Sequence, residues 1–267
     1  MANSPRQVAA RSPVDRAKKG PVRAMQWVWA YYVQTELDQV PEVALNLSRG
    51  CGNPTGFANL QSGEVVVDFG CGGGIDVILA AHKIGSEGRV VGIDFTDQMI
   101  ERAKEAVAEA GLQDRDIKLQ VADMAKSQLP DSFADVVISN CVINLCPDKN
   151  SVYEEAFRIL NPGGRLAISD IVLTENIDAD LQERFQSTWA GCLGGAVPEE
   201  DYWQTLSGAG FVDVQIVARH TLTPDELKAM AACPGEDIAP VPAEDDLAVV
   251  QGKVASIKFN AVKPSVS

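Results

Sequence analysis

Three cysteines lie in short segments of small residues where their thiols could do chemistry. They are Cys51 in Arg-Gly-Cys-Gly-Asn-Pro, Cys141 in Ser-Asn-Cys-Val-Ile-Asn-Leu, and Cys192 in Ala-Gly-Cys-Leu-Gly-Gly. A structural zinc site favours four ligands and paired C-x₂-C spacing, which these residues do not provide. Three thiolates suit a soft, thiophilic centre better. If the fold brings the three residues together, we expect them to form one three-thiol site.

The other three cysteines are expected to have no chemical role. A free cysteine is most often a small buried hydrophobe. Cys71 in a glycine-rich segment fits that interpretation, and Cys146 and Cys233 each precede a proline in an expected loop. The same interpretation is the alternative for each of the first three cysteines taken singly. Only their convergence would favour chemistry over packing.

A glycine-rich loop follows an apolar run in the first half of the sequence. The run Val-Val-Val-Asp68-Phe leads into Gly70, Gly72 and Gly74, and a helical pattern starts at Ile75. Glycines let a backbone turn and approach a ligand closely, and the amides at a helix start point toward it. The spacing is G-x-G-x-G rather than the G-x-G-x-x-G of dinucleotide sites, and no P-loop lysine follows. The loop therefore favours a nucleoside ligand.

Acidic residues end the next two predicted strands. Asp94 closes an apolar strand, and its carboxylate can accept hydrogen bonds from both hydroxyls of a ribose. Asp123 closes the strand after that, where the amino group of an adenine could donate to it. Ligands of open parallel sheets bind at the carboxyl ends of the strands. We therefore expect Asp68, Asp94 and Asp123 to line one nucleoside site.

Strand and helix patterns alternate along the chain, which predicts an α/β fold with a Rossmann-like, doubly wound sheet. Strands are expected at Glu64–Gly70, Arg89–Asp94, Ile117–Ala122, Ala134–Ser139 and Arg165–Asp170, with helices at Ile75–Ile84, Asp97–Ala110 and Lys149–Leu160. Helices at Ala179–Ala190 and Glu199–Ala209 and strands at Val212–Ala218 and Lys253–Val262 follow. The late strands are expected to complete the sheet.

Four parts of the chain are predicted from these patterns. Residues 1–21 form a disordered basic tail, 22–55 an N-terminal cap, 56–175 the nucleoside-binding core, and 176–267 a C-terminal part that binds substrate and completes the sheet. The cap contains a stretch with Trp27, Trp29, Tyr31 and Tyr32, which would pack as core or as a lid over the ligand.

Composition excludes several classes of protein. The formal net charge of −14 argues against nucleic-acid binding, because phosphate binding needs clustered lysine and arginine. The basic stretch Arg6 to Arg23 is expected to be a solvated tail. No apolar run is long enough to span a bilayer, and the N-terminus lacks an apolar signal core. Six cysteines without regular spacing indicate free thiols, so we expect a cytoplasmic protein without a membrane partner.

Taken together, these motifs resemble the class I S-adenosylmethionine (SAM) methyltransferases from about Glu64 to Asp170. From about Val40 to Pro264 the chain resembles the arsenite methyltransferases in particular, and the string around Cys141 is the most diagnostic. The segments that carry this resemblance are Arg49–Pro54, Asp68–Asp76, Ile138–Lys149, Ala190–Ala196 and Gly252–Lys258.

The resemblance implies a class I SAM-methyltransferase fold with C-terminal substrate-binding additions, SAM as the cofactor and trivalent arsenic as the methyl acceptor. It implies that Cys51, Cys141 and Cys192 bind arsenic(III) and act as the catalytic residues. The cofactor-binding residues that it implies are Asp68, Gly70, Gly72, Gly74, Asp94, Phe95, Met99, Asp123, Met124 and Asn140. The acceptor would arrive as an arsenite–thiol conjugate, with an external thiol as reductant.

In the mechanism that the resemblance implies, the arsenic lone pair attacks the methyl group. No general base is then required, and His82 and His220 are expected to have no role. The family usually carries a further cysteine ahead of the Gly-Cys-Gly motif, and this sequence has none before Cys51. Two alternatives therefore stay open. One is a methyltransferase whose organic acceptor stacks on the aromatic residues of the cap, and the other is a thiol-based metalloid sensor without catalysis.

Overall fold

A computed structural model describes residues 31–48, 50–188, 193–231 and 244–265. The predicted basic tail, Trp27, Trp29, Cys192 and Cys233 lie outside these described residues. Within them, no helix is both long and apolar enough to cross a membrane.

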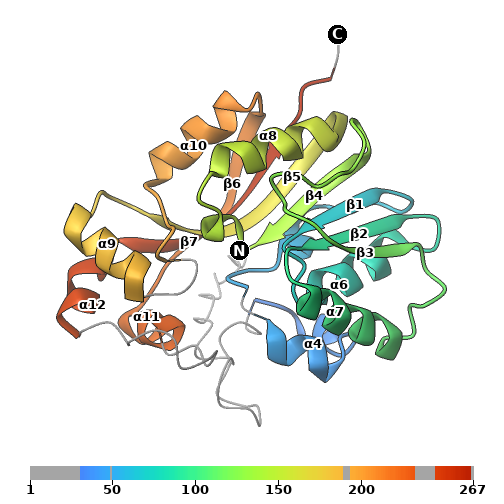
Figure 1. Cartoon of the computed structure of the whole chain (residues 1–267), viewed down its shortest axis with the longest axis horizontal. Coiled ribbons are helices and arrows are strands. Elements are labelled where there is room, and N and C mark those ends of the chain that lie inside the picture. Colours follow the sequence, from blue (N-terminus) through green and yellow to red (C-terminus); the bar gives the residue numbers. More distant parts are fainter. Residues whose placement is uncertain (1–30, 49, 189–192, 232–243, 266–267) are drawn as a thin grey trace, which may run out of the picture.

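Seven strands of the described chain form one sheet, in the order β3-β2-β1-β4-β5-β7-β6 (Figure 1). The first five strands pair in parallel, and β7 is antiparallel to both of its neighbours. The prediction of a doubly wound sheet that the late strands complete is confirmed. The strands are β1 Val65–Phe69, β2 Arg89–Asp94, β3 Ile117–Val121, β4 Ala134–Asn140, β5 Leu160–Leu173, β6 Val212–Thr221 and β7 Val254–Val262.

Helices cover both faces of this sheet. Figure 1 shows α4, α6 and α7 on one face and α8 and α10 on the other, with α9, α11 and α12 grouped beyond the end of β7. The helices are α3 Gln34–Leu37, α4 Glu42–Leu47, α5 Pro54–Phe57, α6 Ile75–Ile84, α7 Asp97–Glu109, the short 3₁₀ turn η1 Ile143–Leu145, α8 Lys149–Ile159, α9 Ala179–Thr188, α10 Glu199–Gly208, α11 Pro224–Ala231 and α12 Glu244–Val250.

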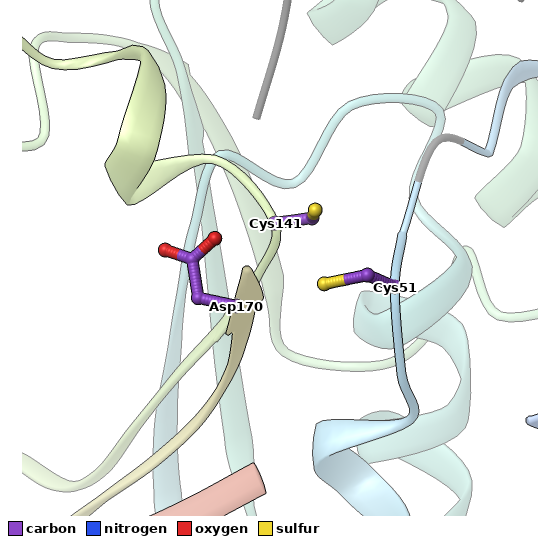
Figure 2. Close-up of side chains that lie close together, drawn as sticks. All are labelled: Cys51, Cys141 and Asp170. Atoms are coloured by element: carbon purple, nitrogen blue, oxygen red, sulfur yellow. The ribbon is translucent and has the colours of Figure 1, made fainter. Parts of the chain in front are cut away.

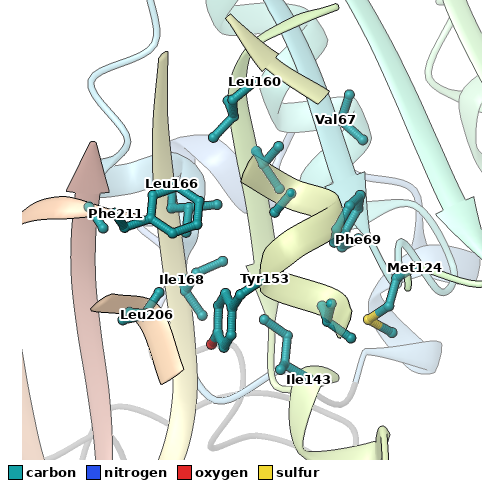
Figure 3. Packing of buried hydrophobic residues seen from close by; sticks show 14 of the residues in the cluster. Val67, Phe69, Met124, Ile143, Tyr153, Leu160, Leu166, Ile168, Leu206 and Phe211 are labelled. Atoms are coloured by element: carbon teal, nitrogen blue, oxygen red, sulfur yellow. The ribbon is translucent and has the colours of Figure 1, made fainter. Parts of the chain in front are cut away.

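The central strands are apolar because both of their faces are covered. In β1, Val66 packs in the cluster that includes Ile78 of α6. Val67 and Phe69 pack in the cluster that includes Tyr153 of α8 (Figure 3). Successive side chains of a strand point to opposite faces, so this one segment anchors both layers. The two clusters hold the carboxyl ends of β1, β2 and β4 in a fixed relation.

The fifth strand is longer than predicted. It runs from Leu160 to Leu173, because β7 pairs with it from Arg165 to Leu173 and Leu160 pairs with Ala134 of β4. The prediction ended this strand at Asp170. Asp170 instead lies inside the strand and is fully buried, which places a carboxyl group under the loop that follows β4.

Candidate active site

Two of the three predicted thiols meet at the carboxyl end of the sheet. The sulfurs of Cys51 and Cys141 and one carboxylate oxygen of Asp170 all lie within 4.8 Å of one another (Figure 2). All three residues are buried, and Cys51 is 0% exposed. Cys192 lies outside the described residues, but its neighbour Leu193 packs in the same cluster as Cys51 and Cys141.

Cys51 comes from the loop between α4 and α5, and hydrogen bonds from distant strands hold it. The backbone N–H groups of Cys51 and Gly52 donate to Oδ1 of Asn140, at 3.1 and 3.2 Å. Asn140 in turn donates through Nδ2 to the carbonyl of Gly52 at 2.9 Å. The hydroxyl of Ser256 in β7 donates to the carbonyl of Cys51 at 2.8 Å. Asn140, predicted to bind the cofactor, therefore positions the cysteine loop.

The loop that carries Cys51 can lie this close to β5 and β7 only because Gly52 has no side chain. A Cβ atom at Gly52 would overlap the hydroxyl of Ser169, and it would lie 2.7 Å from Ser169 Cβ and 3.0 Å from Lys258 Cε. The backbone of Gly52 is not in the left-handed region. The constraint at this position is therefore steric, and it sets the distance between Cys51 and the sheet.

We expect Gly52→Ala to lower the free energy of unfolding by about 1–3 kcal/mol, the usual cost of overpacking. Urea unfolding would measure this change. Gly208→Ala is the matched control, because no heavy atom lies within 4 Å of the added methyl, and it should leave stability unchanged or slightly higher. Equal stability of Gly52→Ala and the wild type would show that the loop does not depend on this close contact.

Cys141 is placed by a sharp turn at the end of β4. Its φ angle is +63°, in the left-handed region that residues other than glycine rarely adopt. Its N–H donates to the carbonyl of Ser169 in β5 at 2.8 Å, and the Ser169 hydroxyl lies 3.7 Å from the sulfur of Cys51. Such strained positions cluster at functional sites. Here the backbone leaves the strand direction at Cys141, and the thiol points toward Cys51.

Asp170 is a member of this cluster that the sequence interpretation missed. Oδ1 of Asp170 accepts hydrogen bonds from Nδ2 of Asn144 and from the N–H of Ile171, both at 2.9 Å, and Oδ2 accepts one from the hydroxyl of Tyr202 at 3.0 Å. Burial raises the pKa of Asp170 to about 7, against the opposing effect of these hydrogen bonds. An acidic residue near the end of an apolar strand was the available signal, as it was for Asp94.

Lys258 places a buried amine beside the two thiols. It lies in the middle of β7, where its Nζ donates to the hydroxyl of Ser256 at 2.7 Å and lies 4.4 Å from the centroid of the Tyr31 ring. Burial lowers the pKa of Lys258, and the nearby Cys51 and Cys141 act in the opposite direction. A positive charge beside a thiol favours the thiolate. A lysine inside an otherwise apolar strand was the signal in the sequence.

His220 also has a partner near this group. Its Nε2 lies 2.8 Å from a carboxylate oxygen of Glu226, a buried residue that also accepts hydrogen bonds from the N–H and hydroxyl of Thr223. Glu226 is close enough to Lys258 and Tyr31 to affect the pKa of each, and it raises both. The pair links the start of α11 to β6 next to the thiol cluster.

The glycine loop connects β1 to α6 and contacts the carboxyl end of β2. Gly70 has a φ angle of +72°, and a Cβ atom there would overlap the side chain of Val142. Gly74 has a φ angle of +90° and forms the N-terminal cap of α6. The N–H of Gly72 donates to Oδ2 of Asp94 at 3.1 Å. Asp94 thus holds the loop as well as ending its strand.

The remaining predicted cofactor residues differ in burial. Asp68 is buried, and burial together with Asp76 and Asp94 raises its pKa. Phe95 directly follows β2 and is 69% exposed. The other three are Met99, half-buried on α7, Asp123, exposed with its carboxylate accepting from the N–H of Ala125 at 2.8 Å, and Met124, buried in the core cluster of Tyr153.

A hydrogen bond between Tyr32 and Asp76 connects the segment that precedes α3 to the start of α6. The hydroxyl of Tyr32 donates to Oδ1 of Asp76 at 3.1 Å, and Nδ2 of Asn140 donates to Oδ2 of Asp76 at 3.0 Å. Burial raises the pKa of Asp76 to about 6. Asn140 therefore contacts both the loop that carries Cys51 and the start of α6, which follows the glycine loop. One residue thus positions both the thiol cluster and the glycine-loop region.

Comparison with known proteins agrees with this arrangement. A family model described as a methyltransferase domain matches residues 60–222, more than half of the chain. The chain belongs to the methyltransferase domain family. This methyltransferase domain is similar to an arsenite methyltransferase of Halobacterium salinarum, with 40% identity over 190 residues that cover 70% of this chain and 48% of the relative.

Two further relatives differ in their acceptors. A solved structure of an arsenic(III) S-adenosylmethionine methyltransferase from Chlamydomonas reinhardtii superposes with a TM-score of 0.70 and 26% identity, covering 87% of this chain and 73% of that one. An aklanonic acid methyltransferase of a Streptomyces species is 32% identical over 56% of this chain and 76% of the relative. The chain spans about half the length of the arsenite methyltransferases that it matches.

Proposed function

We propose that this protein transfers the methyl group of SAM to trivalent arsenic held by Cys51, Cys141 and Cys192. The observation that carries the proposal is the convergence of the Cys51 and Cys141 thiols, buried, at the carboxyl end of the sheet. Ligands bind at this edge in open α/β sheets. The similarity to arsenite methyltransferases supports the proposal.

The residues around the glycine loop fit SAM. Gly70 and Gly72 let the backbone approach the ligand, and the start of α6 presents amides to it. We propose that Asp94 accepts from the ribose hydroxyls, that Asp123 accepts from the adenine amino group, and that Phe95 packs on the adenine ring. The exposure of Phe95 beside the loop is consistent with a ring that a ligand covers. When bound, SAM supplies the electrophilic methyl group.

The thiols are proposed to bind and orient arsenic. Each sulfur–arsenic bond forms as a thiol loses its proton and a hydroxyl of arsenite, or an external thiol, leaves the arsenic with that proton. Lys258 favours the thiolates through its charge. Three sulfur bonds leave arsenic its lone pair, so the chain has to supply no general base for the transfer. Its contributions are alignment of the acceptor and exclusion of water from a buried site.

The flanking parts of the chain are proposed to complete this site. Residues 22–55 form a cap that contributes Cys51, and residues 176–267 form the substrate-binding part. The second assignment is supported by Leu193 and Lys258, which pack against or face the two thiols. We propose Cys192 as the third thiol because its neighbour Leu193 lies in the same buried cluster.

We also propose that the protein works in the cytoplasm with an external thiol. The described cysteines Cys51, Cys71 and Cys146 have free thiols, a state that a reducing compartment maintains. An external thiol such as glutathione would deliver arsenite as a conjugate and act as the reductant.

An organic acceptor is the second candidate, favoured by the similarity to the aklanonic acid methyltransferase. On this hypothesis Tyr31 and Lys258 would contact the acceptor, since they lie against each other and both are near the two thiols. On this hypothesis the thiols of Cys51 and Cys141 would have no function. We therefore rank it second.

Release of S-adenosylhomocysteine from SAM tests the proposal against both alternatives. We expect release to require arsenite together with glutathione, and to stay at background with either one alone. The Cys146→Ser variant should behave like the wild type, because Cys146 is not one of the described residues whose ligand atoms converge in the thiol cluster and it packs against the main core. Release of S-adenosylhomocysteine that does not depend on arsenite would favour an organic acceptor. SAM binding without any such release would favour a sensor.

A further inference from the structure

The oxygen ligand beside the two thiols suggests a second occupant for this site. We infer that Cys51, Cys141 and Asp170 together bind a divalent cation of the zinc group, Zn²⁺ or Cd²⁺. Their ligand atoms lie within 4.8 Å of one another (Figure 2). Two sulfurs on one tetrahedral zinc ion are about 3.8 Å apart, given Zn–S bonds of about 2.3 Å. Side-chain adjustments of about 1 Å would therefore close the site around an ion.

Hydrogen bonds fix the position of the Asp170 carboxylate. Asn144, the N–H of Ile171 and the hydroxyl of Tyr202 all donate to it. A carboxylate has about four lone-pair positions, so these three donors leave about one for an ion. Asn144 is itself fixed, because its Nδ2 also donates to the carbonyl of Ile171 at 2.6 Å. Such outer contacts hold the ligands of known metal sites in place.

The charges of the group balance around a divalent ion. As metal ligands, Cys51 and Cys141 are thiolates and Asp170 is a carboxylate, which gives three negative charges. A divalent cation and the ammonium of Lys258, which faces the same thiols, give three positive charges. The nearby Glu226 accepts hydrogen bonds from the N–H and hydroxyl of Thr223 and lies 2.8 Å from Nε2 of His220. A buried site is stable only when its charges are paired, and a divalent ion satisfies that condition here.

The ligand chemistry separates this cation from arsenic. Two sulfurs and one carboxylate oxygen suit a borderline cation such as zinc, whereas trivalent arsenic is soft and favours sulfur. Both occupants need Cys51 and Cys141, so each should exclude the other. The binding claim stands apart from methyl transfer, while the claim that the cation inhibits rests on the proposed function. A zinc-group cation would then be a competitive regulator of arsenite use.

Titration of the reduced 267-residue chain with Cd²⁺, in buffer free of small thiols, tests whether the cation binds. Thiolate-to-cadmium charge-transfer absorbance should saturate at one equivalent per chain, and Zn²⁺ should displace the Cd²⁺. Asp170→Asn is nearly isosteric, and we expect it to weaken Cd²⁺ binding by about tenfold or more. It should weaken arsenite binding by a smaller factor than Cd²⁺ binding, since arsenic favours sulfur. Cys146→Ser is the matched control and should bind Cd²⁺ as the wild type does.

X-ray absorption of the zinc-loaded wild-type protein identifies the ligands without any variant. The inference predicts two sulfur ligands together with oxygen or nitrogen ligands. Three sulfurs, or a loss of affinity in Cys192→Ser but not in Asp170→Asn, would overturn it. Absence of a saturable Cd²⁺ equivalent would also overturn it. Cation binding without arsenite-dependent methyl transfer would contradict the proposed function and leave the cation site standing.

Discussion

Replacing Cys141 with serine is expected to lower arsenite-dependent methyl transfer by about 100-fold or more, because a hydroxyl is a hard and poorly ionised substitute for a thiolate. The backbone of Cys141 lies in a strained turn fixed by a hydrogen bond to Ser169. Serine should keep that turn, since its side chain is nearly the same size. SAM affinity should therefore stay within about twofold of the wild type. Turnover assays and calorimetry on the same preparation would measure both quantities.

Cys51→Ser should give the same result, because Cys51 and Cys141 are equivalent in the proposed arsenic site. Cys146→Ser serves as the control for the loss of a thiol elsewhere. If Cys141→Ser or Cys51→Ser keeps full arsenite-dependent activity, the thiol pair does not hold the acceptor. Loss of SAM affinity together with activity would mean that the substitution damaged the fold, and arsenite binding would then have to be measured directly.

Replacing Asp94 with alanine is expected to weaken SAM binding by about 1–3 kcal/mol, the cost of removing a charged hydrogen-bonding partner. One carboxylate oxygen of Asp94 holds the N–H of Gly72, and the other accepts from the N–H and hydroxyl of Thr96. The substitution therefore removes the proposed ribose contact and loosens the glycine loop at once. Calorimetric titration with SAM, or with S-adenosylhomocysteine, would give the change directly.

Two further variants separate these contributions. Asp94→Asn keeps one oxygen acceptor and should lose less affinity than alanine. Thr96→Val removes the hydroxyl that donates to Asp94 but keeps the carboxylate, and its effect should be smaller still. Unchanged SAM affinity in Asp94→Ala would show that Asp94 does not bind the ribose, whatever its contact with the glycine loop.

The sheet was predictable because its strands carry their own signals. The bounds of β2 and α6 coincide with those predicted from sequence, since Asp94 ends β2 and Gly74 caps the start of α6. The central strands, such as β1 and β4, are buried on both faces. The short helices α3, α4 and α5 and the helices α11 and α12 were not predicted. Segments this short have little periodicity, and tertiary contacts decide their structure.

The site was harder to predict because it depends on which loops meet. Asn140 lies 89 residues from Cys51 in sequence and yet holds its backbone. Nothing local to either residue indicates that contact. Asp170 and Lys258 were visible as charged residues within apolar strands, but their common neighbourhood arises only from the pairing of β5 with β7. The thiols could be nominated singly from sequence, and their convergence needed the structure.

The fate of the transferred methyl group tests the central claim most directly. The protein would be incubated with SAM carrying a deuterated methyl group, arsenite and glutathione, and the products separated by chromatography with elemental and molecular mass detection. We expect the label on arsenic, in amounts equal to the S-adenosylhomocysteine formed, and we expect none in Cys141→Ser. Formation of S-adenosylhomocysteine with the label absent from arsenic would contradict the account.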